Sequence, residues 1–174
     1  MRFLFAFLLT LLPAFAPVNA QAQGAATLIA DNISIPAGSQ TLIAEGNVEV
    51  FFGGTRLSAR RITFDQATDR LTIDGPVFIV TTDGTILTAD VATLDPQLRN
   101  GILRGARLVL DEQLQLAASQ IDRVEGRYTQ LYQVAATSCR ICADGDTPLW
   151  EIRARRVIHD QEEQQLYFDD ATFR

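Results

Sequence analysis

Two cysteines, Cys139 and Cys142, form a Cys-x-x-Cys motif and are the only cysteines in the chain. A redox-active motif of the thioredoxin type stands at the start of a helix within a β-α-β unit, and no such unit is visible around them. A zinc site needs further ligands, and His159 is the one other soft candidate. The N-terminus is typical of an exported protein, so the compartment is oxidising. We therefore predict that the pair is disulfide-bonded, either to each other or to cysteines in another part of the protein.

The remaining candidates for chemistry do not form a catalytic group. His159 stands where earlier repeats carry isoleucine or phenylalanine, so we interpret it as a structural residue. The acidic pairs Glu162-Glu163 and Asp169-Asp170 are adjacent in sequence, and neighbours on a strand point to opposite faces, so neither pair is expected to work as an acid–base couple. No Gly-rich phosphate loop, nucleophile elbow or metal-ligand cluster is present. We expect neither an enzyme nor a cofactor.

The charge of the chain restricts its partners. It has 15 basic and 21 acidic residues, and an acidic chain argues against nucleic acid, which requires a basic surface. Every basic side chain apart from one histidine is an arginine. The planar guanidinium suits phosphate and carboxylate groups, although genomic composition accounts better for the exclusive use of arginine.

Residues 1–22 are predicted to be a cleaved signal peptide. Arg2 is followed by an apolar run over residues 3–15, and small-residue cleavage patterns end at Ala20 and Ala22. The run is shorter than the roughly 20 residues of a membrane-spanning helix, so an uncleaved anchor is the weaker alternative. No cysteine lies near the cleavage site, which disfavours a lipoprotein anchor. We predict export to a periplasm-like compartment, leaving about 150 residues, enough for one domain with its own core.

The mature sequence repeats about every thirty residues. Alanines that follow alternating apolar residues recur at steps of 29, 30, 29 and 36, at Ala30, Ala59, Ala89, Ala118 and Ala154. Second landmarks recur at Gly46, Gly75 and Gly105, with Val134 and Asp170 in the matching places. Regular spacing of this size is typical of stacked architectures in which one repeat cannot bury its own apolar face.

Each repeat contains two alternating, β-branched runs that predict strands. In the first run the apolar phase slips by one residue after the alanine, as between Ala59 and Ile62, which indicates a bulge or a sharp corner. In the second run, Gly46 and Gly75 lie inside the strand and indicate a bend or a close backbone approach. Turn-like stretches separate the runs at residues 36–39, 65–69, 82–84 and 95–97, and residues 160–165 are predicted to be a turn rather than a helix.

The predicted fold is all-β, with repeated two-strand units stacked into an open β-jellyroll of two facing antiparallel sheets. An ordinary sandwich is the alternative, but it does not require so regular a period. The alanines suggest that the sheets approach each other at those positions. Residues of one parity are expected to face the interior, and for these the alternative is plain core: Leu42, Val48, Val50, Leu71, Ile73, Val77 and Ile79.

Several segments resemble the OstA-like domain of lipopolysaccharide (LPS) transport proteins. They are residues 28–33 (LIADNI), 44–50 (AEGNVEV) and 57–62 (LSARRI). The tail is similar to the stretch that joins this domain to the outer-membrane barrel in the LptD family of LPS-assembly proteins. It comprises residues 139–142 (CRIC), 148–160 (PLWEIRARRVIHD) and 166–171 (LYFDDA). The likeness covers essentially the whole mature chain, although members of that family continue as a barrel and this chain stops at Arg174.

The resemblance implies an OstA-like jellyroll over residues 23–136 and a junction with a final repeat over residues 137–174, leading towards a barrel. It implies a periplasmic domain, associated with the outer membrane, that binds LPS acyl chains along the seven interior residues and passes LPS towards the cell surface. The implied partners are LPS, an OstA-like bridge protein at the N-terminal edge and, where a barrel is present, an outer-membrane lipoprotein plug. It also implies disulfides from Cys139 and Cys142 to barrel cysteines. Two alternatives are a soluble LPS carrier of the LptA kind and a β-solenoid or adhesin fragment that binds no lipid.

Overall fold

The computed structural model describes residues 26–110, 113–138 and 148–174. The predicted signal peptide and the predicted disulfide at Cys139 and Cys142 lie outside these residues. Every regular element in the described part of the chain is a strand, which confirms the predicted all-β class. The strands are β1 (Thr27–Ile29), β2 (Asn32–Ser34), β3 (Thr41–Phe52), β4 (Thr55–Asp65), β5 (Arg70–Val80), β6 (Ile86–Leu94), β7 (Gly101–Leu110), β8 (Leu114–Val124), β9 (Tyr128–Thr137), β10 (Ile152–Asp160) and β11 (Gln165–Phe173).

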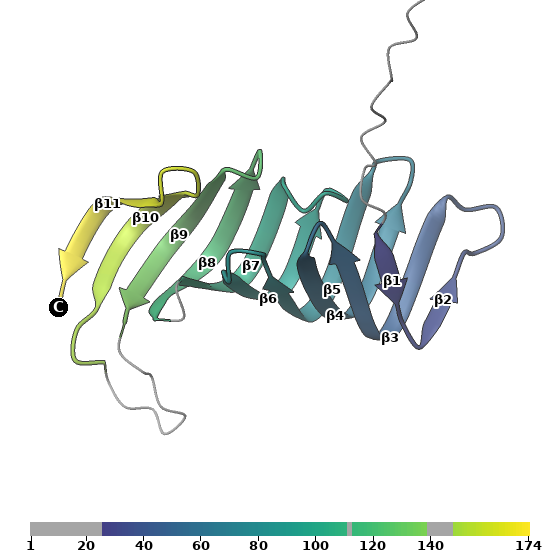
Figure 1. Ribbon diagram of the computed structural model, residues 1–174, viewed down its shortest axis with the longest axis horizontal. Coiled ribbons are helices and arrows are strands. Elements are labelled where there is room, and N and C mark those ends of the chain that lie inside the picture. The colour runs from purple at the N-terminus through teal and green to yellow at the C-terminus, as the bar shows by residue number, and fades with distance from the viewer. Residues whose placement is uncertain (1–25, 111–112, 139–147) are drawn as a thin grey trace, which may run out of the picture.

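All eleven strands belong to one antiparallel sheet that does not close on itself. From β3 to β11 each strand pairs with the next in the sequence, and the turns predicted at residues 65–69, 82–84, 95–97 and 160–165 fall at connections between consecutive strands. Both β1 and β2 pair with β3, β1 along residues 49–51 and β2 along residues 43–45. Figure 1 shows the resulting row of strands, with β1 and β2 at one end and β11 at the other.

The long strands bend near their middle, where the buried face changes parity. In β4, Leu57 and Ala59 are buried before the bend and Ile62 after it. The same three-residue step separates Ala89 from Ala92 in β6, and it recurs in β8 and β10. One extra residue at the bend keeps apolar side chains on the inner side of both halves. The predicted phase slip is therefore confirmed as the corner of the sheet.

Strands β3, β7, β9 and β11 turn this corner with backbone that ordinary residues rarely adopt, whereas Gly75 of β5 has no positive φ angle. Gly46 and Gly105 have φ angles of 75° and 58°. A Cβ on Gly75 would lie 2.1 Å from the Asp90 carbonyl oxygen, so the close backbone approach predicted there is confirmed; at Gly46 the nearest atom is the side-chain Asp31 Oδ2, at 2.4 Å. In β9 and β11, Gln133 and Asp170 take the same left-handed region. The repeat spacing in the sequence placed the landmark of β9 at Val134, one residue after Gln133, where the structure has the left-handed conformation.

The bend divides the sheet into two leaves. Leaf A is the half that continues from β1 (residues 48–59 of β3 and β4, for example), and leaf B is the half that continues from β2 (residues 41–45 and 61–65). The facing sheets expected from the sequence are thus two halves of the same strands. In the N-terminal part of Figure 1, the darker strand halves lie in front of the paler ones. Four of the repeating alanines, Ala59, Ala89, Ala118 and Ala154, are buried directly before the corner.

One hydrophobic cluster fills the space between the leaves. It contains Val48 and Ile79 from leaf A together with Ile73 and Leu94 from leaf B. Each strand from β3 to β10 contributes buried residues on both sides of its bend, and Leu166 of β11 packs against the cluster, so the apolar interior runs continuously along the sheet. The open side of the sheet lies between two rims, rim A with the turns at residues 53–54 and 81–85, and rim B with those at residues 95–100, 125–127 and 161–164.

Candidate functional site

The structure places all seven predicted interior residues in or against this cluster. Val48, Ile73, Val77 and Ile79 are at most 1% exposed. Leu42, Val50 and Leu71 are partly buried and pack against the cluster. The seven therefore share one interior, and three of them retain access to its open side.

The neighbours of opposite parity face outward, as the alternation predicted. Phe78, next to Ile79, is 40% exposed. Glu49, next to Val50, forms an ion pair with Arg56 on the outer surface of the sheet. These two residues are matched controls for any measurement on the interior, because each is the sequence neighbour of a residue of the inner wall.

Two adjoining clefts occupy the mouth between the rims, each with a volume of about 460 Å³. The first is lined by Thr81 and Phe52 from rim A and by Arg123 from rim B. The second lies between Leu114 of leaf A and His159 of leaf B. Gln161 lines both clefts, so they adjoin each other along the mouth.

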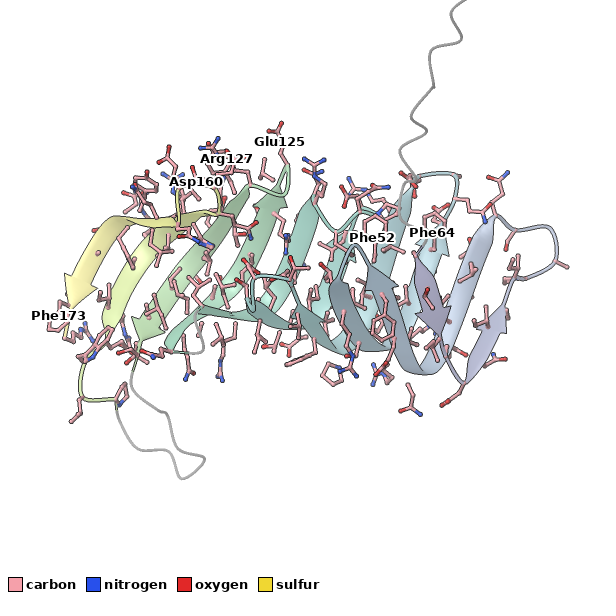
Figure 2. All side chains as sticks on the ribbon, in the orientation of Figure 1. Phe52, Phe64, Glu125, Arg127, Asp160 and Phe173 are labelled. Atoms are coloured by element: carbon pink, nitrogen blue, oxygen red, sulfur yellow. The ribbon has the colours of Figure 1, made fainter. Side chains whose placement is uncertain are left out.

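Rim B carries a charged cluster at this opening. The Arg127 guanidinium donates to both oxygens of Asp160, with Nη2–Oδ2 at 2.7 Å, and its Nη1 lies 2.7 Å from Glu162 Oε2. The guanidinium also lies 4.9 Å from the centre of the Tyr128 ring. The hydrogen bond from Arg127 lowers the pKa of Asp160 and in turn raises the pKa of Arg127. Figure 2 shows Arg127, Asp160 and Glu125 together along this rim.

The charged cluster corrects one expectation. Glu162 and Glu163 do not point to opposite faces, because they lie in the turn after β10 and not on a strand. Both approach Arg127, at 2.7 Å and 3.8 Å. The pair therefore helps to neutralise the charge of Arg127.

The sequence analysis missed Arg123, which faces the interior and is 9% exposed. Its signal was available in the repeat pattern. Arg123 follows Ile121 by two residues, as Phe64 follows Ile62 in β4 and Leu94 follows Ala92 in β6. An arginine thus stands at a position where the two preceding even-numbered strands carry large apolar residues.

Both ends of the sheet expose strand edges. Among the residues that the structure describes, β1 and β2 pair with β3 alone, and β11 pairs with β10 alone. Apolar side chains accompany the edges: Ile33 is 48% exposed at the N-terminal edge and Phe173 is 70% exposed at the C-terminal edge. Unpaired backbone groups beside exposed apolar side chains are what strand addition requires.

Comparisons with known proteins contribute little to the assignment. No family model and no curated protein matches the chain. Among solved structures, a match is "LptH, the LptA homologous periplasmic component of the conserved lipopolysaccharide transport device from Pseudomonas aeruginosa". It has 13% identity over 83% of this chain and 81% of that chain, with a TM-score of 0.34. Superposition at this level does not establish a shared fold.

Two further observations concern the described residues alone. They contain no group of three or more histidine, cysteine or acidic side chains arranged to hold a metal ion. They also include no helix of the length and apolar character needed to cross a membrane.

Proposed function

We propose that this protein is a periplasmic domain that holds the acyl chains of lipopolysaccharide between its two leaves and passes the lipid towards the outer membrane. The observation that carries the proposal is the continuous apolar interior of an open sheet, built from the walls of every repeat. The resemblance of residues 28–62 and of the tail to OstA-like and LptD-family sequences supports the choice of ligand. The proposed role is binding and transfer, without catalysis.

Apolar burial supplies the binding energy in this proposal. Each buried methylene contributes about 0.8 kcal/mol, so several acyl chains are held without a specific polar lock. Leu42, Val50 and Leu71 are the part of the inner wall that a chain meets first, because they are not fully covered. Deeper contact, at Ile79 for example, requires the acyl chain to enter between the leaves. The phosphorylated sugars stay at the mouth, beside the clefts and the arginines of rim B.

Transfer between proteins uses the open edges of the sheet. An OstA-like bridge protein that adds its last strand to β1 and β2 extends the sheet and with it the apolar interior. The opposite edge, β11, leads towards an outer-membrane barrel and its lipoprotein plug in an LptD-type arrangement. The cysteines of the CRIC motif, Cys139 and Cys142, are proposed to form disulfides with that barrel. The chain contains no nucleotide-binding loop, so the energy for transport comes from other components.

Site-specific photo-crosslinking tests the proposal. We expect photoreactive residues at Val50 and at Ile79 to capture LPS, and matched residues at Glu49 and Phe78 to capture none. Capture at Val50 without capture at Ile79 would place the lipid at the mouth and not between the leaves. Equal capture at both parities, in a protein shown to be folded by circular dichroism, would reject the assignment of the interior.

A soluble carrier of the LptA kind uses the same interior but needs no barrel. It is distinguished by crosslinks from the β11 edge, which in a carrier reach a second bridge protein and in an LptD-type domain reach the barrel. A structural solenoid or adhesin fragment predicts no capture of LPS at any position. The exposed edges at both ends favour an element of a longer assembly over a closed carrier.

A further inference from the structure

A row of polar side chains interrupts the apolar interior on three neighbouring strands of leaf B. Arg123 of β8 lies opposite Thr129 of β9, and Thr129 lies opposite His159 of β10. All three are less than a tenth exposed. Arg123 and His159 each line one of the two adjoining clefts. The row therefore lies on the inner wall just inside the mouth. Arg123 and His159 are more than 30 residues apart in the sequence, and the pairing of β8, β9 and β10 brings them together.

Arg123 is a buried cation without a direct counter-ion. Its Nε is buried and meets no hydrogen-bond acceptor. Within the described residues, its guanidinium forms no ion pair with a carboxylate. An isolated charge in such a place is unfavourable unless it is compensated. The other two arginines of the cleft differ: Arg127 is held by Asp160 and Glu162, and Arg99 donates to the Glu125 carbonyl oxygen at 2.7 Å.

The two carboxylates that attract Arg123, Asp83 and Asp95, are engaged with their own turns. Asp83 accepts hydrogen bonds from the Thr85 backbone N–H at 3.2 Å and from the Thr85 hydroxyl at 3.1 Å. Asp95 accepts from the Arg99 N–H at 2.7 Å and from Asn100 Nδ2 at 2.8 Å. The charges of both carboxylates raise the pKa of the Arg123 guanidinium, but the effect of burial is larger and lowers it. The group remains charged at neutral pH because arginine does not lose its proton in proteins, so its attraction for a further anion is not satisfied.

We propose that Arg123, with Thr129 and His159 beside it, binds a phosphate group on the head of the lipid that the interior holds. The inference rests on the proposed function and specifies which part of the ligand is recognised. The guanidinium fork matches two phosphate oxygens, and the threonine hydroxyl adds a rotatable donor. One amphiphile can therefore bind with its acyl chains in the interior and its phosphate at the row beside the mouth.

Binding of matched lipids tests the row. The probes are lipid A with its phosphates, the same lipid A after removal of the phosphates, and inorganic phosphate. We expect Arg123→Gln to weaken binding of phosphorylated lipid A by about tenfold or more, the effect of losing a hydrogen bond to a charged group. Binding of the dephosphorylated lipid should not change. Arg104→Gln removes an exposed, outward-facing arginine from the neighbouring strand β7 and should leave both affinities as in the wild type.

A second measurement uses the unmodified chain and so does not depend on the folding of a variant. In protein labelled with ¹⁵N-arginine, the Nε–H signal of Arg123, assigned with Arg123→Lys, should shift when phosphorylated lipid A is added. The dephosphorylated lipid should not shift it. A shift with inorganic phosphate at similar concentration would mean a free-anion site and would overturn the lipid assignment.

The outcomes separate the two proposals. Wild-type protein that binds neither lipid would overturn the proposed function and this inference together. Wild-type protein that binds both lipids with equal affinity, and an Arg123 signal that does not respond to phosphorylated lipid A, would overturn the phosphate site alone. A loss of affinity for both lipids in folded Arg123→Gln would show that the row shapes the interior and does not read the phosphate.

Discussion

Removing a wall residue of the interior should cost far more stability than removing its outward neighbour. Ile79 is 0% exposed and lies within the cluster between the leaves. Ile79→Ala deletes three carbon groups, worth about 2.4 kcal/mol at about 0.8 kcal/mol each. The cavity left behind adds to this, and buried Ile-to-Ala changes cost about 2–5 kcal/mol. We expect a loss in that range, equivalent to a fall in melting temperature on the order of 10 °C for a domain of this size.

Phe78→Ala is the matched control, because Phe78 is the adjacent residue and is 40% exposed. We expect it to lose about 1 kcal/mol or less, as most surface substitutions do, although it removes more atoms than Ile79→Ala. Urea unfolding followed by circular dichroism measures both free energies, and equal slopes would show that the unfolded reference is unchanged. A larger loss for Phe78→Ala than for Ile79→Ala would refute the assignment of the inner face.

Two other perturbations probe the edge and the charged cluster. Ile33→Pro removes a backbone donor from β2 and restricts its φ angle. We therefore expect weaker binding to an OstA-like bridge protein in a pull-down assay, with the unfolding midpoint of the domain nearly unchanged. Full binding by a folded variant would exclude this edge as the docking surface. Asp160→Asn removes the carboxylate whose pKa is lowered by the hydrogen bond from Arg127. A carboxylate with a lowered pKa in the folded state stabilises the protein at pH values above its ordinary pKa, near 4. That stabilisation is lost as the pH falls through the pKa of the folded state. We therefore expect the variant to be less stable than the wild type at pH 7, with the difference shrinking at strongly acidic pH, and a difference independent of pH would show that the ionised pair does not stabilise the fold.

Local patterns in the sequence predicted the parts of this fold that depend on local physics. Alternation along a strand is a property of neighbouring residues, so the inward parity of Ile73 and Ile79 followed from the sequence alone. The step from Ala59 to Ile62 indicated a corner because an extra residue changes parity wherever it occurs. The sequence did not show that one sheet forms both walls, since that depends on which strand halves pair across the whole chain.

The charged cluster of rim B depends on contacts between distant residues. Arg127 and Asp160 are 33 residues apart and meet because β8, β9 and β10 pair in order. Glu162 and Glu163 were expected on opposite faces by a rule that holds for strands, whereas the turn after β10 places both near Arg127. The left-handed conformation of Gln133 had no sequence signal, because glutamine does not ordinarily adopt it.

The distribution of polar residues on the two inner walls gives the proposed ligand an orientation. Leaf A stays apolar along the sheet, as Ile79, Leu87 and Leu116 show. Leaf B is apolar at Leu94 but carries Arg123 on the next even-numbered strand. An amphiphile seated between the leaves therefore lowers its free energy by directing its phosphate towards rim B of the C-terminal repeats, while its chains stay against leaf A and the N-terminal repeats. In the proposed arrangement the head lies closer to β11 than the chains do, because β8 is three strands from that edge.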